Sequence, residues 1–284
     1  MRVAVLGVGL IGGSIGLAAR QRLGCEVAGW GHNRATVDRA AGLGAVDSVA
    51  DSVAEACAGA EIVFCAAPVA VLPDLAREAL AASGPEAVVT DAGSTKRSIV
   101  AALGEDGRFV GGHPLAGAET AGVENARADL FEGARWYLTP GERTGDVLYE
   151  RLQSTIAGLG ARPQAIDAAA HDRLMATISH LPHVLANALV AQAASELTGA
   201  GDRLPDVGPS FRDATRVAGS NPSVWADIYS ANADAVLAAI DDVVARLGEA
   251  RELIDSGDRE AIAAWHARAA ELAAGLAEDP EAPE

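Results

Sequence analysis

Short apolar runs alternate with helical patterns in the first part of the chain. The apolar runs predict strands at Arg2–Leu6, Glu26–Trp30, Glu61–Ala66, Ala87–Asp91, Phe109–Gly111 and Trp136–Thr139. Apolar residues at helical spacing predict helices between them, at Gly13–Gln21, Arg34–Leu43, Ser52–Ala58, Ala70–Ala82 and Lys96–Leu103. This alternation predicts an α/β fold with a parallel, doubly wound sheet and ligands outside the carboxyl ends of the strands.

The pattern becomes wholly helical after about residue 167. The stretch from Asp167 to Leu197 has no strand signal and is rich in Ala, Leu and Val. Asn221 followed by Pro222 is typical of a helix start, with Asn221 as the cap and Pro222 in the first turn. Further helices are predicted at Val224–Leu247, Glu249–Ile254 and Arg259–Ala273.

These changes of pattern predict the domain organisation. We expect a nucleotide-binding domain at residues 1–166, a helical substrate and dimerisation domain at 167–276, and a disordered acidic tail at 277–284. The alanine-rich helical half suits close helix packing and a homodimer.

A glycine-rich turn follows the first predicted strand. Gly7 permits a tight turn, Gly9 lets the backbone approach a pyrophosphate, and Gly12 allows the helix to pack against the strand. The spacing between a strand and a helix therefore favours a Rossmann-type dinucleotide site over a purely structural turn. The cofactor contacts expected here are Gly7, Gly9, Leu10, Ile11 and Gly12.

Composition narrows the class of partner. Acidic residues outnumber basic ones by 39 to 22, giving a net charge of −17, which argues against nucleic acid and an anionic membrane surface. No apolar stretch is judged long enough to span a membrane, and the chain starts directly with a strand, so no signal peptide is expected. Three cysteines indicate reduced, buried thiols in a cytoplasmic protein.

The end of the second strand bears on cofactor choice. NAD-binding folds carry an acidic residue there, but this chain has Gly31. Arg34 could face a 2′-phosphate, or it could simply begin a solvated helix. His32 or Asn33 could bind a ribose. NADP is slightly favoured, and NAD remains open.

Two loops after predicted strands carry candidate chemistry. Ser94 follows the fourth strand, where it could serve the reaction or cap the next helix. His113 lies between a glycine pair and Pro114, so it is held in place yet accessible, and its pKa suits proton transfer. The alternative is an ordinary loop histidine. Glu119 is close enough to tune His113 or to bind substrate.

A histidine-rich segment lies in the helical half. His171 and His180 fall on opposite faces of a regular helix, so we expect no metal site. His180 and His183 share a face and could bind a polar substrate, with core packing as the alternative for His183. Pro182 is expected to kink the helix.

Two arginines suit carboxylate binding. Arg212 and Arg216 are four residues apart, on one face if the segment is helical, and each offers a planar fork for a carboxylate. A solvated helix face is the alternative. Trp225 could shape a pocket for a ring.

Together these motifs resemble the prephenate/arogenate dehydrogenase family of tyrosine biosynthesis. The resemblance extends in order over nearly the whole chain, through GVGLIGGS, DAGSTK, GGHPLAGAE, HD, SHLPH, FRDATR and NPSVW. The HPLAG and SHLPH motifs are far more specific than the glycine motif.

The resemblance implies an oxidative decarboxylation dependent on NAD or NADP. Hydride leaves the ring carbinol carbon for the nicotinamide, carbon dioxide is lost, and the ring becomes aromatic. It implies that His113 takes the hydroxyl proton, that Ser94 assists, and that Arg216 binds a substrate carboxylate. It further assigns pocket positions to His183, Glu119, Asp172 and Trp225.

The favoured substrate is prephenate, because His183 could donate to a keto acid carboxylate; arogenate is the alternative. A β-hydroxyacid-type dehydrogenase is less favoured, because it generally needs a lysine in the helical domain and Lys96 is the sole lysine of this chain. A nicotinamide-sensing regulator would need neither the His–Pro turn nor the carboxylate-binding arginine.

Overall fold

The computed structural model describes residues 1–117, 120–197 and 207–277. The chain divides into two compact units, Met1–Val236 and Leu237–Glu284. The domain boundary expected at residues 166 and 167 stays a prediction.

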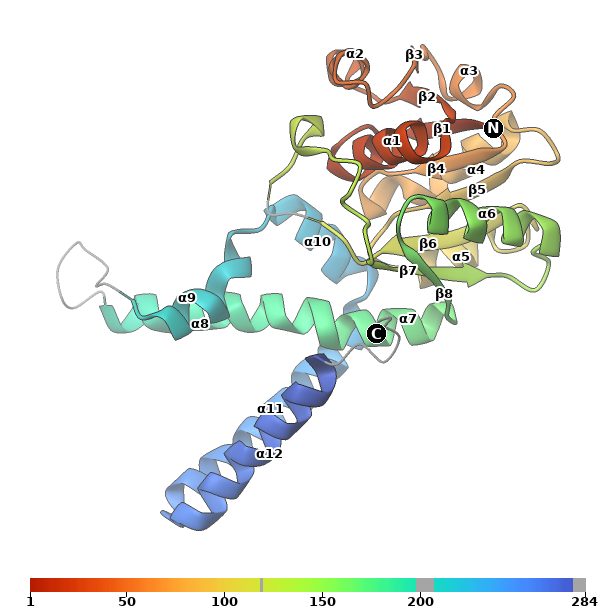
Figure 1. The fold of residues 1–284 in the computed structure, drawn as a ribbon. Coiled ribbons are helices and arrows are strands. Elements are labelled where there is room, and N and C mark those ends of the chain that lie inside the picture. Colours follow the sequence, from red (N-terminus) through yellow and green to blue (C-terminus); the bar gives the residue numbers. More distant parts are fainter. Residues whose placement is uncertain (118–119, 198–206, 278–284) are drawn as a thin grey trace. The chain divides into compact units, whose positions relative to one another are not determined.

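The described part of the first unit contains one eight-stranded sheet in the order β3-β2-β1-β4-β5-β6-β7-β8 (Figure 1). Its strands are β1 (Arg2–Leu6), β2 (Glu26–Trp30), β3 (Ser48–Val49), β4 (Ile62–Cys65), β5 (Val88–Asp91), β6 (Phe109–Pro114), β7 (Arg135–Pro140) and β8 (Arg162–Ala165). The predicted α/β fold is confirmed.

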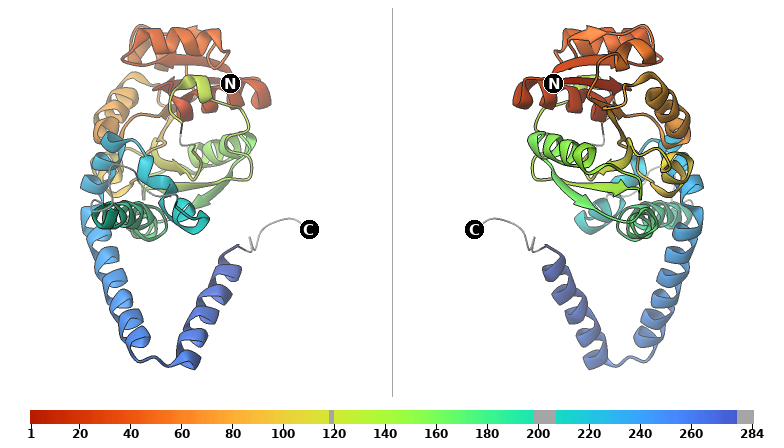
Figure 2. Two further views of the ribbon diagram at one scale, coloured as in Figure 1. Left: turned by 90° about the vertical axis from the view of Figure 1, so that its left-hand side faces the viewer. Right: turned by 90° about the vertical axis from the view of Figure 1, so that its right-hand side faces the viewer.

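Helices cover both faces of the sheet (Figure 2). Side chains of α1 (Leu10–Leu23), α2 (Arg34–Gly42) and α6 (Asp146–Gly158) pack on one face. The opposite face is covered by α3 (Val53–Cys57), α4 (Leu72–Ala82) and α5 (Arg97–Leu103). The strands between these layers are buried on both sides, as parallel strands require.

The sheet is not wholly parallel, which corrects the sequence-based expectation. β7 pairs antiparallel with β6, placing His113 opposite Tyr137, and β8 is parallel to β7. A parallel pair needs a crossover, usually helical. The described connection between β6 and β7 instead carries a 3₁₀ turn at Val123–Asn125, and Arg127 N–H donates to Ser14 Oγ at 3.0 Å. The chain therefore returns beside β6 in the opposite direction.

Two strands and one α-helix before residue 167 have no counterpart in the sequence prediction: β3, β8 and α6. β3 has only two residues, and β8 includes Pro163 and exposed positions, so neither produces an apolar run. Both lie at the edges of the sheet, where proline and short strands are tolerated.

The helical part of the first unit begins with α7 (Ala168–Met175), a π-helical segment (Ala176–His180) and α8 (Leu181–Leu197). It continues with α9 (Pro209–Thr215), a 3₁₀ turn (Arg216–Gly219) and α10 (Pro222–Ala231). Asn221 caps α10 by accepting from Ser223 N–H at 3.0 Å, with Pro222 in the first turn, as the sequence predicts.

The second unit is a helical hairpin. Its helices are the rest of α11 (Ala233–Asp255), which begins in the first unit, and α12 (Arg259–Ala277); they diverge from their connecting turn (Figure 2). The helix expected at Val224–Leu247 is interrupted at Asn232, and Glu249–Ile254 belongs to α11.

The helix irregularity expected at Pro182 takes a different form. The five residues before α8 are π-helical, and a π turn has more residues per turn than an α turn. Proline removes a backbone hydrogen-bond donor from the helix. The irregularity that results is a widened π turn just before Pro182.

One helical run, Ala168–Ser195, is long and apolar enough to cross a membrane by length and composition alone. This differs from the sequence-based expectation, because abundant Ala, Leu and Val keep the mean hydropathy of the run high despite its scattered polar residues. Core helices of soluble proteins meet the same criterion. In this run His171, Asp172 and His180 are buried inside the first unit.

We expect Gly12→Ala to lower the free energy of unfolding by about 2 kcal/mol or more, because a Cβ there would overlap the Gly7 carbonyl. Gly42→Ala is the matched control: it lies in α2 with open space around its Cβ position, so alanine should be neutral or slightly stabilising. Urea unfolding of both variants measures the difference. Equal stability would contradict the close approach of α1 to the turn.

Candidate active site

The turn between β1 and α1 leaves space where a dinucleotide would need it. Gly7 has φ of +99°, and a Cβ on Gly7 or Gly12 would overlap backbone atoms, so both glycines are required by packing. A Cβ on Gly9 would meet nothing within 4 Å. Gly9 is the N-cap of α1, which starts at Leu10 and Ile11. Its lack of a side chain leaves the helix N-terminus accessible to a phosphate.

The residues after β2 already have partners inside the chain. Arg34 is exposed and pairs with Asp38 at 3.0 Å and with Asp51. Asn33 caps α2, its Oδ1 accepting from Thr36 N–H at 3.3 Å. The His32 ring is exposed and lies edge-on to Trp30, with 5.0 Å between ring centroids.

A buried ion pair anchors the loop after β5. Lys96 Nζ pairs with Asp91, and both side chains are fully buried. The Asp91 carboxylate also accepts from Gly112 N–H at 3.0 Å and Gly93 N–H at 2.8 Å. Asp91 therefore joins the ends of β5 and β6, which carry Ser94 and His113.

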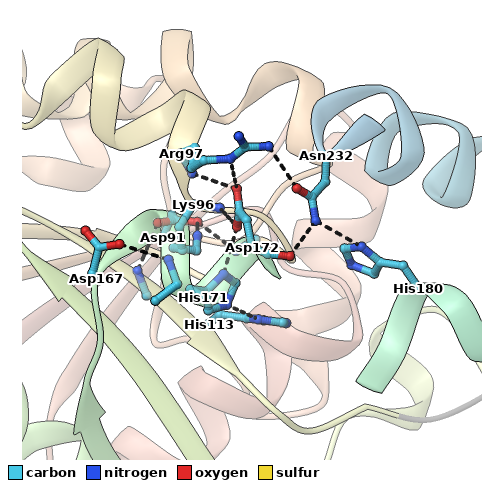
Figure 3. Close-up of polar contacts among 12 residues, drawn as sticks. Asp91, Lys96, Arg97, His113, Asp167, His171, Asp172, His180 and Asn232 are labelled. Atoms are coloured by element: carbon cyan, nitrogen blue, oxygen red, sulfur yellow. Dashed lines mark hydrogen bonds and ion pairs between the residues drawn. The ribbon is translucent and has the colours of Figure 1, made fainter. Parts of the chain in front are cut away.

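His113 begins a chain of hydrogen bonds that ends on a carboxylate (Figure 3). His113 Nδ1 lies 2.9 Å from His171 Nε2, and His171 Nδ1 lies 2.8 Å from Asp172 Oδ1. Tyr137 packs edge-on against the His171 ring, with 5.7 Å between centroids. His113 is partly exposed, whereas His171 and Asp172 are fully buried.

The environment keeps these imidazoles neutral. Burial lowers the pKa of His113 well below its usual value, and the nearby His171, Lys96 and His180 lower it further. Burial also lowers the pKa of His171, while the hydrogen bond to Asp172 opposes that shift. A neutral His113 is able to accept a proton at neutral pH.

Asp172 also caps a helix from a distant part of the chain. Its carboxylate accepts from Lys96 N–H at 2.7 Å and Arg97 N–H at 3.0 Å, at the start of α5. Arg97 Nε lies 3.3 Å from the same carboxylate. Asn232 Nδ2 donates to the Asp172 backbone carbonyl at 2.8 Å. The hydrogen bonds to His171, Arg97 and Lys96 lower the pKa of Asp172 against the effect of burial.

A second cluster lies around Trp225 of α10. His183 stacks on its ring with centroids 3.5 Å apart, and His180 lies edge-on to it at 6.0 Å. His183 Nδ1 lies 3.0 Å from the Ser179 carbonyl, and Nε2 lies 3.4 Å from Ser220 Oγ.

His180 connects the two clusters. Its ring is buried 3.3 Å from Asn232 Nδ2, and burial lowers its pKa to about 4. His171 and His180, expected on opposite helix faces, both face the Asp172 region, because the π-helical segment between them shifts the helical phase.

Burial lowers the pKa of His183, and the nearby Arg216 lowers it further, against the hydrogen bond to the Ser179 carbonyl. Arg216 is exposed and lies in the 3₁₀ turn after α9, whereas Arg212 lies within α9.

Two predicted site residues remain to be described. Ser94 is half-buried and does not cap α5, whose N-cap is Lys96 and whose first N–H groups donate to Asp172. Glu119 lies outside the described residues.

Several residues of this region have no role in the sequence-based prediction: Asp91, Lys96, Arg97, His171 and Asn232. The adjacent pair His171 and Asp172 was the one sign of this network in the sequence. The residues that contact the pair come from three distant segments. No spacing in the sequence reveals those contacts.

Comparison with known proteins gives the family. Residues 15–164 match the model of the prephenate dehydrogenase nucleotide-binding domain, and residues 167–268 match that of the prephenate dehydrogenase dimerization domain. The chain is 34% identical to the prephenate dehydrogenase of Bacillus subtilis over 283 residues, covering 96% of this chain and 76% of the relative.

Solved structures of prephenate and arogenate dehydrogenases are similar to this chain over nearly its whole length. The prephenate dehydrogenase of Aquifex aeolicus, in complex with hydroxyphenyl propionate and NAD+, is 30% identical with a TM-score of 0.91, over 97% of this chain and 98% of that one. Synechocystis arogenate dehydrogenase is 27% identical with a TM-score of 0.84, over 97% and 100%. With both domain models matched in order along one chain, this protein belongs to the prephenate dehydrogenase family.

Proposed function

We propose that this enzyme oxidises and decarboxylates prephenate to 4-hydroxyphenylpyruvate, with His113 as the proton acceptor. The observation that carries the proposal is the neutral, partly exposed His113 imidazole, whose Nδ1 is held by His171 so that Nε2 is left for substrate. Membership of the prephenate dehydrogenase family supports the assignment.

The turn at Gly7–Gly12 and the N-terminus of α1 suit the pyrophosphate of a nicotinamide dinucleotide, since Gly9 leaves open space there. When bound, this cofactor supplies the acceptor for the substrate's hydride. His113 Nε2 takes the hydroxyl proton as the ring carbinol becomes a carbonyl. Loss of the ring carboxylate as carbon dioxide then passes its bonding electrons through the ring to the carbonyl oxygen. That oxygen regains a proton, and the ring becomes an aromatic phenol. Ser94, beside the same strand ends, assists at the hydroxyl.

The second cluster suits the substrate's charged groups. Arg216 offers a guanidinium fork to a carboxylate, and the stacked His183 and Trp225 form an aromatic wall beside it. Glu119 keeps its predicted pocket role. Asp172 is buried, with its carboxylate bonded to His171 and α5, so it acts on substrate through His171.

One observation favours arogenate as a second candidate. A carbonyl oxygen only accepts, so the contact with Ser179 requires the proton of neutral His183 on Nδ1. Nε2 is then an acceptor, which suits the ammonium group of arogenate, whereas the keto acid side chain of prephenate would require a protonated His183. Burial lowers the pKa of His183, which favours the neutral ring.

For the cofactor we propose NAD. The sequence favours NADP through Arg34, but Asp38 and Asp51 pair with that arginine, so a 2′-phosphate would approach two carboxylates and one guanidinium. Like charges at such distances disfavour binding.

We propose a homodimer in the cytoplasm. Large apolar side chains are exposed on the hairpin of α11 and α12, including Leu247, Ile254 and Leu272. Only 22% of the most apolar stretch within Ala168–Ser195 is buried. Cys25, Cys57 and Cys65 are buried, free thiols, which suits a reducing compartment.

Steady-state rates with prephenate and with arogenate test the reaction. We expect kcat/KM to be flat near neutral pH and to fall only well below pH 6.5, because protonation of His113 removes the acceptor and its pKa is lowered. His113→Asn should lower kcat by about 100-fold or more while the cofactor still binds. Turnover of neither substrate, or near-normal turnover by the variant, would contradict the assignment.

Arg216→Ala should raise the substrate KM by about 10-fold to 100-fold with little change in cofactor affinity, because it removes a charged partner of the carboxylate. Arg77→Ala, which removes an exposed arginine on α4 paired with Asp74, is the control and should leave KM unchanged. An unchanged KM in Arg216→Ala would remove this residue from the site.

Cofactor choice is tested by comparing kcat/KM for NAD and NADP. We expect a preference for NAD of about tenfold or more, reduced in Asp51→Asn because Arg34 loses a carboxylate partner. Asp74→Asn, which removes an ion pair with Arg77 on α4, should leave the ratio unaltered. A wild-type preference for NADP would overturn the proposal.

A further inference from the structure

The hydrogen bonds behind His113 leave one arrangement of protons. Asp172 Oδ1, in a carboxylate whose pKa is lowered, only accepts, so the 2.8 Å contact requires the proton of His171 on Nδ1. The Nε2 of neutral His171 is then a bare acceptor. The 2.9 Å contact with His113 Nδ1 accordingly requires a proton on His113 Nδ1. Neutral His113 is left with a bare Nε2.

Asp172 is held where it can impose this arrangement. Both its oxygens accept N–H groups at the start of α5, at 2.7 and 3.0 Å, and Arg97 Nε approaches one of them. Arg97 is in turn held by Asn232 Oδ1 at 3.0 Å and by Asp234. The carboxylate has little freedom to rotate, and every partner is a donor.

The hydrogen bonds from His113 through His171 also place the negative charge of Asp172 behind His113. When His113 gains a proton at Nε2, its ring becomes positive between other charged or titratable groups. Lys96 and His180 disfavour that charge, as would any positive charge on His171. The hydrogen bond from His113 Nδ1 to the bare Nε2 of neutral His171, which Asp172 holds in place, opposes them. Asp91 also faces this region, but it is engaged by Lys96 and two backbone N–H groups.

We propose that His171 is a positioning residue for the reaction: linked to Asp172, it fixes His113 in the tautomer with a bare Nε2 and stabilises the imidazolium formed when the hydroxyl proton is taken. The proposal rests on the proposed function, in which His113 is the acceptor. His171 itself is fully buried and acts only through His113.

This role differs from simple core packing. His171 also contacts the Tyr137 ring, and a residue that only filled space would be replaceable by an apolar side chain of similar size. A tautomer-fixing residue requires an acceptor at the position of Nε2. Glutamine can supply one through Oε1, whereas leucine cannot.

The test compares His171→Gln with His171→Leu. We expect kcat to fall by about 100-fold in His171→Leu, with the substrate KM changed less than about threefold, because a histidine in the wrong tautomer cannot accept the proton. His171→Gln should recover kcat to within about tenfold of wild type. Cofactor affinity and the thermal midpoint serve as folding controls.

A spectroscopic measurement reads the tautomer without turnover. Nitrogen-15 NMR of the wild-type imidazoles above the pKa of His113 should show a protonated Nδ1 and a bare Nε2 on His113. The His171→Gln variant should keep this pattern, and His171→Leu should show a mixture of tautomers.

The outcomes separate the two proposals. A proton on Nε2 of wild-type His113, unchanged kcat in His171→Leu, or an equal loss of kcat in both variants would overturn the positioning role. If wild-type enzyme turns over neither prephenate nor arogenate, the proposed function fails, while the NMR result still reports on the tautomer.

Discussion

The buried carboxylate of Asp172 contacts both the start of α5 and the His171 ring, and the arrangement of the candidate site depends on these contacts. Transfer of a carboxylate from water into a protein interior costs several kcal/mol unless hydrogen bonds replace its hydration. Here Lys96 and Arg97 N–H groups and the His171 ring replace it, and hydrogen bonds to a charged group contribute about 1.5 to 3 kcal/mol each. A single side chain thus satisfies the N-terminus of α5 and orients the imidazole behind His113.

This contact also joins parts of the chain that are far apart in sequence. Asp172 lies within α7, α5 follows β5, and Asn232 is the C-cap of α10. The first unit consequently includes both the sheet and the helices up to Val236. His113 on β6 and the aromatic cluster around Trp225 share one network because His180 contacts both Asn232 and Trp225.

Much of the fold could be predicted from the sequence, because buried strands and amphipathic helices leave local periodic patterns. β1, β2 and the cap at Asn221 are examples. The reversal at β7 could not, since direction depends on how the β6–β7 connection packs against α1. For the site, His113 stood out because of its glycine and proline neighbours. The importance of His171 depends on its contact with His113, 58 residues away in sequence, and on the contacts of Asp172 with Lys96 and Arg97, 76 and 75 residues away. A single sequence carries no signal for these contacts.

The π-helical segment Ala176–His180 makes the segment between His171 and His183 sensitive to length. Removing one residue there would restore the α-helical period and rotate α8 by about 100° relative to α7. His183 would turn away from Trp225, although every side chain of the cluster would still be present. The same site residues would then no longer form the same site. The number of residues between His171 and His183 therefore matters as much as their identities.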